Sequence, residues 1–292
     1  MGLCVQKEDE MKFTKMHGCG NDYVYINGFT EHISEDKKPD FVRFVSDRHF
    51  GIGGDGAIFI NPSDVADFEM EMWNADGTRS EMCGNGIRCV GKYVYDHGLT
   101  DKTEITVVSY GKVKYLTLYP ENGKVEKIRV DMGEPILKPS EVPVSIEGFE
   151  GDAVISQPID IEGKVYDFTC VSMGNPHAIT YVDDVHTTDV HGIGPKIENN
   201  RAFPKRVNAE FIHVVDRGHI DMRVWERGTG ETWACGTGAC ASVVSSILNN
   251  YTDNTVEVTL LGGKLEINWD GPGCNVFMTG PATEVFSGEI DY

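Results

Sequence analysis

Two cysteines in matching sequence contexts are the residues of this chain best suited to chemistry. Cys83 is followed by Gly84-Asn85-Gly86, and Cys235 is followed by Gly236-Thr237-Gly238. A thiolate is a base, and a thiol is the corresponding acid. Two thiols on either side of one cleft could remove a proton from one face of a carbon and return a proton to the other. The pair therefore predicts inversion of configuration at a carbon atom.

The cysteines belong to an internal repeat that covers most of the chain. They are 152 positions apart, and the same interval relates Trp73 to Trp225 and Ala57 to Ala209. A repeat of this length is far above the roughly 20–50 residues of a solenoid unit. It indicates two homologous domains.

Each cysteine is expected at the start of a helix. The residues after Cys83 read as a helix that stops at Gly98, and those after Cys235 read as a helix up to Leu248. Amides at a helix start lower the pKa of a thiol and can hold a carboxylate. The alternative is that both are small buried residues, which is the usual role of a lone cysteine. The duplicated Gly-x-Gly context favours chemistry for this pair, whereas a structural role is expected for Cys89, Cys170, Cys240 and Cys274, and for His17 and His49.

Composition excludes several classes of partner. The chain has 292 residues and a net charge of −20, so a nucleic-acid backbone would repel it. No apolar run reaches the length of a membrane span, and residues 1–10 are charged and predict an unstructured extension rather than a signal peptide. The eight cysteines are expected to be reduced thiols of a cytoplasmic protein, and their spacing gives no zinc site.

The elements that must position the two cysteines occur in the same order in both copies. Each copy begins with a strand, a Gly-Asn turn and a strand, at 11–26 and 168–182. Strands with period-two alternation then lead to each cysteine, as in 68–73 and 220–225, and strand pairs follow each helix. The pattern predicts an α+β fold of two pseudo-twofold domains, each of mostly antiparallel strands around a central helix. We expect the first domain at 11–132, with the tail 280–292 packed back on it, the second at 133–279, and the active site in the cleft between them.

Longer motifs around these cysteines are similar to those of a known family. They are Gly18-Cys19-Gly20-Asn21-Asp22, Asp47-Arg48-His49-Phe50-Gly51-Ile52-Gly53, Trp73-Asn74-Ala75-Asp76-Gly77, Glu81-Met82-Cys83-Gly84-Asn85-Gly86, Gly174-Asn175-Pro176-His177, Arg206-Val207-Asn208 and the segment from Glu226-Arg227-Gly228 to Gly238. Together they resemble the diaminopimelate epimerase family from Met11 to the C-terminus. Gly56 and Cys19 depart from residues that are frequent in the family.

The resemblance implies a homodimeric isomerase that needs no pyridoxal phosphate, other cofactor or metal. Its implied reaction interconverts LL- and meso-diaminopimelate, a small diamino diacid. Cys83 and Cys235 would be the opposed acid and base, with His177 supporting Cys83 and Glu226 supporting Cys235. Backbone amides of Gly84, Asn85, Gly236 and Thr237 would hold the reacting carboxylate, and Asn21, Asn74, Asn175, Asn208 and Arg227 would bind the distal end.

Other interpretations remain open from the residues alone. Asn21 and Asn175 could be turn formers, His177 a core histidine and Glu226 a solvated strand end. A racemase of the same scaffold acting on histidine or proline derivatives is the main alternative function, although proline-type members resemble a Cys-Gly-His loop rather than Cys83-Gly84-Asn85. A non-catalytic amino-acid-binding protein or a thiol redox sensor is a further alternative, but neither requires a thiol at a helix start in both halves.

Overall fold

The chain folds into two compact units of mixed sheet and helix. The structure, a computed structural model, describes residues 10–80 and 83–292. One unit comprises the chain up to Ile128 together with Ala282–Tyr292, and the other comprises Arg129–Pro281. Most of the expected N-terminal extension (residues 1–9) and Glu81-Met82 of the first cysteine motif lie outside the described residues.

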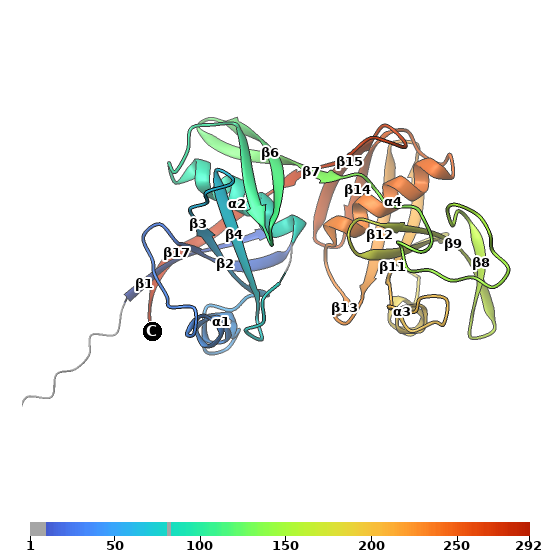
Figure 1. Cartoon of the computed structure of the whole chain (residues 1–292), viewed down its shortest axis with the longest axis horizontal. Coiled ribbons are helices and arrows are strands. Elements are labelled where there is room, and N and C mark those ends of the chain that lie inside the picture. The colour runs from blue at the N-terminus through green and yellow to red at the C-terminus, as the bar shows by residue number, and fades with distance from the viewer. Residues whose placement is uncertain (1–9, 81–82) are drawn as a thin grey trace, which may run out of the picture. The chain divides into compact units, whose positions relative to one another are not determined.

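The first unit is built on strands joined in a mixed pattern (Figure 1). β1 (Glu10–Gly18) pairs antiparallel with β2 (Asn21–Asn27), and β2 runs parallel to β3 (Gly56–Asn61). β3 pairs antiparallel with β4 (Phe68–Asn74), β4 runs parallel to β5 (Glu104–Ser109), and β5 pairs antiparallel with β6 (Lys112–Glu121). The last strand, β17 (Thr283–Asp291), pairs antiparallel with β1, so β1 lies between β17 and β2.

The second unit repeats this order of pairing. β8 (Gln157–Ile161) and β9 (Lys164–Ser172) form a hairpin, β9 pairs antiparallel with β10 (Pro176–Tyr181), and β10 runs parallel to β11 (Asn208–Asp216). β11 pairs antiparallel with β12 (His219–Glu226), which also pairs with the short β13 (Gly230–Glu231). β14 (Thr255–Leu260), β15 (Gly263–Trp269) and β16 (Val276–Pro281) complete the unit, and β7 (Lys124–Gly133) leads into it from the first.

The register of the strands confirms the duplication. Ala57 pairs with Trp73 between β3 and β4, and Ala209 pairs with Trp225 between β11 and β12. Both residues of the second pair are 152 positions beyond those of the first. The repeat in the sequence is therefore also a repeat in the pairing of the strands.

A long buried helix lies against the strands of each unit (Figure 1). These are α2 (Gly84–Asp96) and α4 (Gly236–Leu248), and each begins directly after a cysteine of the repeat. Small residues let the helices approach the sheet closely. At Gly91 of α2, an added Cβ would lie 3.0 Å from a methyl carbon of Leu118 on β6. The sequence-based prediction of a central helix wrapped by strands is confirmed.

Each unit also has a second, shorter helix that the sequence analysis did not predict. α1 (Lys38–Ser46) buries Phe41, Val42 and Val45 against the sheet of the first unit, and α3 (Val190–Glu198) begins at the side-chain cap of Asp189. The segment 133–161, rich in Pro and Gly, carries the buried residues Val142, Val144 and Val154 of the second unit's core. Helices as short as α1 and α3 have too few turns to show a clear hydrophobic period in the sequence.

Candidate active site

Cys83 lies at the N-cap of α2, where the sequence placed it. Its backbone is extended, and its Sγ accepts a hydrogen bond from the amide of Gly86 at 3.3 Å. The thiol donates to Oδ1 of Asn21 at 3.0 Å. The helical ladder begins with Ile87 N–H bonded to the carbonyl of Cys83, so the amides of Gly84 and Asn85 precede that ladder.

Asp55, which the sequence analysis did not single out, fixes the orientation of Asn21. The Asn21 amide nitrogen donates to Oδ2 of Asp55 at 2.7 Å, which leaves its Oδ1 directed at Cys83. Asp55 is itself held by Arg48 at 2.9 Å and by the backbone amide of Asp22 at 3.2 Å. The acidic side chain therefore decides which atom of Asn21 faces the thiol.

Two other predicted residues of the first unit use their side chains locally. The amide nitrogen of Asn74 donates to the Thr78 hydroxyl at 3.0 Å, which is a turn contact. Asn85 is buried, and its Oδ1 accepts from the guanidinium of Arg88 at 2.8 Å.

Cys235 lies at the N-cap of α4 and is only 5% exposed. Burial raises its pKa well above the usual value for a thiol, and the negative charges of Glu226 and Glu210 raise it further. The Thr237 hydroxyl, 3.5 Å from Sγ, and the amide of Gly238 offset only part of this effect. The expectation that the helix start lowers the pKa of this thiol is wrong, because loss of solvent and two nearby carboxylates outweigh the helix. These surroundings favour the protonated form of the Cys235 thiol.

Glu226 at the end of β12 lies next to this thiol. Its Oε1 accepts from the Thr232 hydroxyl at 2.5 Å, and it also accepts a hydrogen bond from Cys235. Burial is the largest cause of its raised pKa, against which these two hydrogen bonds act. The structure thus brings Glu226 and Cys235 together and does not leave Glu226 as a solvated strand end.

His177 is completely buried on β10, in a network that joins it to the start of α4. Its Nδ1 lies 2.6 Å from Oε1 of Glu210, and its Nε2 lies 3.0 Å from Oδ1 of Asn175. The Asn175 amide nitrogen donates to the hydroxyl of Thr237 at 3.2 Å. Glu210 is a further residue that the sequence analysis missed. The available signal was a charged residue between the apolar residues Ala209 and Phe211.

Asn208, which pairs with His177 between β11 and β10, is hydrogen-bonded to the backbone of Arg227. Asn208 is buried, donates to the carbonyl of Pro176 at 3.0 Å and accepts from the backbone amide of Arg227 at 2.8 Å. The Arg227 side chain is exposed and donates to the carbonyl of Lys205 at 3.1 Å. Asn208 therefore holds the turn that carries Arg227, while the guanidinium faces solvent and not a buried recess.

Cys89, Cys170 and Cys240 have the buried surroundings of structural residues. Cys89 and Cys170 are fully buried, and burial raises the pKa of Cys89 to about 12 and the pKa of Cys170 above its usual value. Cys240 is buried within α4, and Cys274 is exposed.

In the part of the chain that the structure describes, no group of three His, Cys, Asp or Glu side chains is placed to hold a metal ion. No helix among these residues has the length and apolar character of a membrane span.

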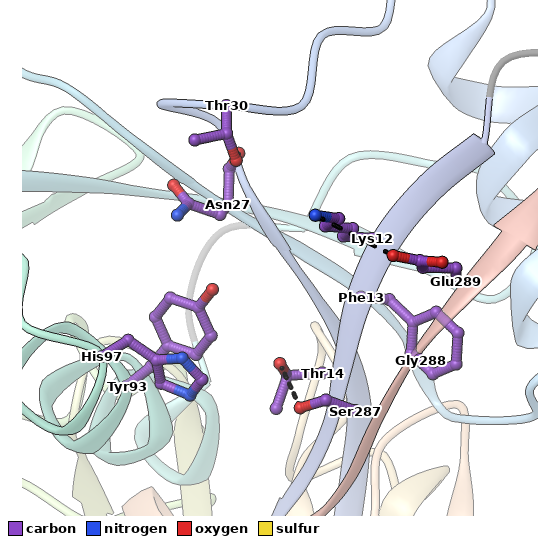
Figure 2. A pocket seen from close by; sticks show the side chains of 10 residues that line it. All are labelled: Lys12, Phe13, Thr14, Asn27, Thr30, Tyr93, His97, Ser287, Gly288 and Glu289. Atoms are coloured by element: carbon purple, nitrogen blue, oxygen red, sulfur yellow. Dashed lines mark hydrogen bonds and ion pairs between the residues drawn. The ribbon is translucent and has the colours of Figure 1, made fainter.

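A pocket of about 470 Å³ lies elsewhere in the first unit (Figure 2). Its walls come from β1, β2, β17 and the end of α2, and they include Lys12, Tyr93, His97 and Glu289. None of the residues predicted to take part in catalysis or binding lines it. The pocket is thus separate from the surroundings of Cys83.

Comparisons with known proteins agree on one family. The family model for diaminopimelate epimerase matches residues 13–138 and 169–285. Diaminopimelate epimerase of Agathobacter rectalis is 58% identical over 285 residues, which cover 96% of this chain and 99% of the relative. Diaminopimelate epimerase of Methanococcus maripaludis strain S2 is 53% identical over 281 residues, which cover 96% of this chain and 100% of the relative.

Solved structures with the same fold are more distant in sequence. A phenazine biosynthesis protein of the PhzF family from Enterococcus faecalis has a TM-score of 0.70 at 11% identity, covering 97% of this chain and 100% of that chain. A hydroxyproline epimerase from Agrobacterium vitis has a TM-score of 0.67 at 13% identity, covering 98% of this chain and 92% of that chain. These likenesses concern the fold alone. The match of the family model and the near full-length identity of the relatives show that this chain belongs to the diaminopimelate epimerase family.

Proposed function

We propose that this protein interconverts LL- and meso-diaminopimelate by a two-thiol proton transfer that needs no cofactor. The observation that carries the proposal is the pair of cysteines at equivalent N-caps of two buried helices, in a chain whose relatives bear the name of this activity. The two copies of the repeat, taken as domains at 11–132 with the tail 280–292 and at 133–279, would each contribute one thiol.

Cys235 would act as the acid, and Cys83 would act as the base once its proton has been transferred to His177. Cys235 carries its proton because it is buried beside carboxylates, and Glu226 can take up that proton or return it through their hydrogen bond. His177 would serve Cys83 in the same way. Reversing both protonation states would run the reaction in the opposite direction.

The carboxylate next to the reacting carbon would be held by the amides of Gly84, Asn85, Gly236 and Thr237. Amides at a helix start bind anions, and they stabilise the charge that develops as the proton leaves. This arrangement replaces the electron sink of a cofactor. Arg227 is exposed, and its planar fork would engage the distal carboxylate when substrate binds.

Asn21, Asn74, Asn175 and Asn208 would complete the distal site. The structure supports a positioning role for Asn208, which holds the Arg227 amide, and supports direct contact with the thiol for Asn21. We further propose that the protein works in the cytoplasm, where thiols stay reduced, and as a homodimer, as the family resemblance implies.

The test is turnover of LL-diaminopimelate by chelator-treated protein free of pyridoxal phosphate. We expect formation of the meso isomer at the same rate as with untreated protein. Faster turnover of proline or histidine than of diaminopimelate would refute the substrate assignment while leaving the two-thiol mechanism in place. Loss of activity on chelation, with recovery on adding metal, would refute the cofactor-independent mechanism.

A further inference from the structure

A buried histidine–glutamate pair connects two neighbouring strands of the second unit. His177 on β10 and Glu210 on β11 are both 0% exposed, and these strands run parallel to one another. The Nδ1 to Oε1 distance is 2.6 Å, which is typical of a hydrogen bond to an ionised partner. Among the described residues, no hydrogen-bond partner reaches the second carboxylate oxygen, Oε2. The imidazole of His177 is therefore the main hydrogen-bond partner of the Glu210 carboxylate.

The other ring nitrogen also faces an acceptor. Nε2 lies 3.0 Å from Oδ1 of Asn175, and the amide nitrogen of Asn175 is engaged with the Thr237 hydroxyl. A neutral imidazole has one donor and one acceptor nitrogen, whereas the imidazolium has two donors. With the Asn175 amide in this orientation both nitrogens of His177 face acceptors, an arrangement that suits the imidazolium better than the neutral ring.

We propose that Glu210 is a positioning residue that keeps His177 as an imidazolium with Nε2–H directed at Oδ1 of Asn175. This inference rests on the proposed function, in which His177 is a proton partner of a thiol. An imidazolium stabilises a neighbouring thiolate and can supply a proton, and a neutral ring in another tautomer does neither. Glu210 acts through His177 and makes no contact with substrate in this proposal.

The start of α4 holds the carboxylate in place. A Cβ added at Gly238 would lie 2.8 Å from Oε1 of Glu210, so the helix passes directly against the carboxylate. The nearby titratable groups are Cys170, Glu226 and Cys235, and the charge of Glu210 raises the pKa of all three. Burial is the main cause of the raised pKa of Glu226, and a positive charge on His177 offsets part of that rise. The charges of Glu210 and His177 thus have opposite effects on the pKa of Glu226, the proposed proton partner of Cys235.

Nitrogen-15 NMR of protein labelled at histidine tests the charge state. Comparison with His177→Asn assigns the ring signals of His177. In the wild type at neutral pH we expect both nitrogens to have imidazolium shifts, and in Glu210→Gln we expect the shifts of a neutral ring. Glu210→Asp, which keeps the charge, should restore the imidazolium in part. Tyr181→Phe removes a partly buried hydrogen bond to Ser245 at the other end of β10 and is the matched control, in which the ring signals should not change.

Kinetics with diaminopimelate provide a second measurement. We expect Glu210→Gln to lower kcat by on the order of 100-fold, the scale of a general acid–base contribution, with a much smaller change in KM. A neutral His177 ring in the wild type, or an unchanged imidazolium and kcat in Glu210→Gln, would overturn the proposal. If the wild type showed the expected shifts but did not turn over diaminopimelate, the proposed function would fail and the assignment of the charge to Glu210 would stand.

Discussion

Gly86 and Gly238 are a matched pair whose substitution tests the packing around the second thiol. They occupy the same position in α2 and α4, three residues after each cysteine. Both lie within regular helix, so alanine suits the backbone and should gain about 0.5–1 kcal/mol over glycine. Any difference between the two alanine variants must then come from their surroundings.

The surroundings differ in how freely they can move. A Cβ at Gly86 would lie 2.8 Å from Cδ1 of Ile58, the flexible end of an aliphatic side chain. A Cβ at Gly238 would lie 2.8 Å from Oε1 of Glu210 and 2.9 Å from Cε of Met222. Glu210 can retreat only by weakening its hydrogen bond to His177.

We therefore expect unequal losses of stability. For Gly86→Ala, a small rotation of Ile58 relieves the contact, and the free energy of unfolding should change by less than about 1 kcal/mol. For Gly238→Ala, overpacking costs about 1–3 kcal/mol and a weakened hydrogen bond between charged groups costs about 1.5–3 kcal/mol. After the gain in helix propensity, a net loss of about 2–5 kcal/mol remains.

Urea unfolding followed by circular dichroism measures these losses, and kcat with LL-diaminopimelate measures the effect on the site. Gly238→Ala should lower kcat at least tenfold more than Gly86→Ala, because the displaced carboxylate no longer fixes His177. Equal unfolding free energies and equal kcat values for the two variants would refute this account of the second loop.

Three further substitutions test the individual contacts. Glu226→Gln removes a negative charge that raises the pKa of Cys235, so the pH at which iodoacetamide alkylates this thiol should fall. The value of kcat should drop by about 100-fold or more. An unchanged alkylation profile would contradict the contact between Glu226 and Cys235. Arg227→Lys keeps the charge but loses the planar guanidinium, so KM for diaminopimelate should rise roughly tenfold. Because the side chain is exposed, the free energy of unfolding should stay within about 0.5 kcal/mol of the wild-type value. An unchanged KM would show that Arg227 does not belong to the distal site. Asp55→Ala frees the amide of Asn21 to rotate, so kcat/KM should fall roughly tenfold, and wild-type kinetics would show that this orientation is unimportant.

Much of the fold could be predicted from the sequence because it is repeated. The constant interval between Trp73 and Trp225 identified equivalent strands, and Gly98 marked the end of α2. The two short helices α1 and α3 gave no comparable signal. Segment 133–161 has the composition of a connection, yet it contributes side chains to the core of the second unit.

The candidate site was predictable in its residue types and less so in its electrostatics. The Gly-x-Gly context placed both cysteines at helix starts, but burial, which decides the pKa of Cys235, is not visible in the sequence. Asp55 and Glu210 were missed because each is a single acidic residue outside the recognised motifs. Their importance follows from distances to Asn21 and His177 that depend on strand pairing and loop conformation.

Deuterium incorporation by the single-thiol variants in D2O tests the central claim most directly. Cys83→Ser and Cys235→Ser should each abolish epimerisation, because a hydroxyl is too weak an acid and base to replace a thiol. The remaining thiol still serves its own face, so each variant should exchange the α-proton of only one stereoisomer, LL or meso, and the two variants should differ in which. If both variants remain active epimerases, or if one variant exchanges the α-protons of both isomers, then the two thiols do not act on opposite faces of the carbon.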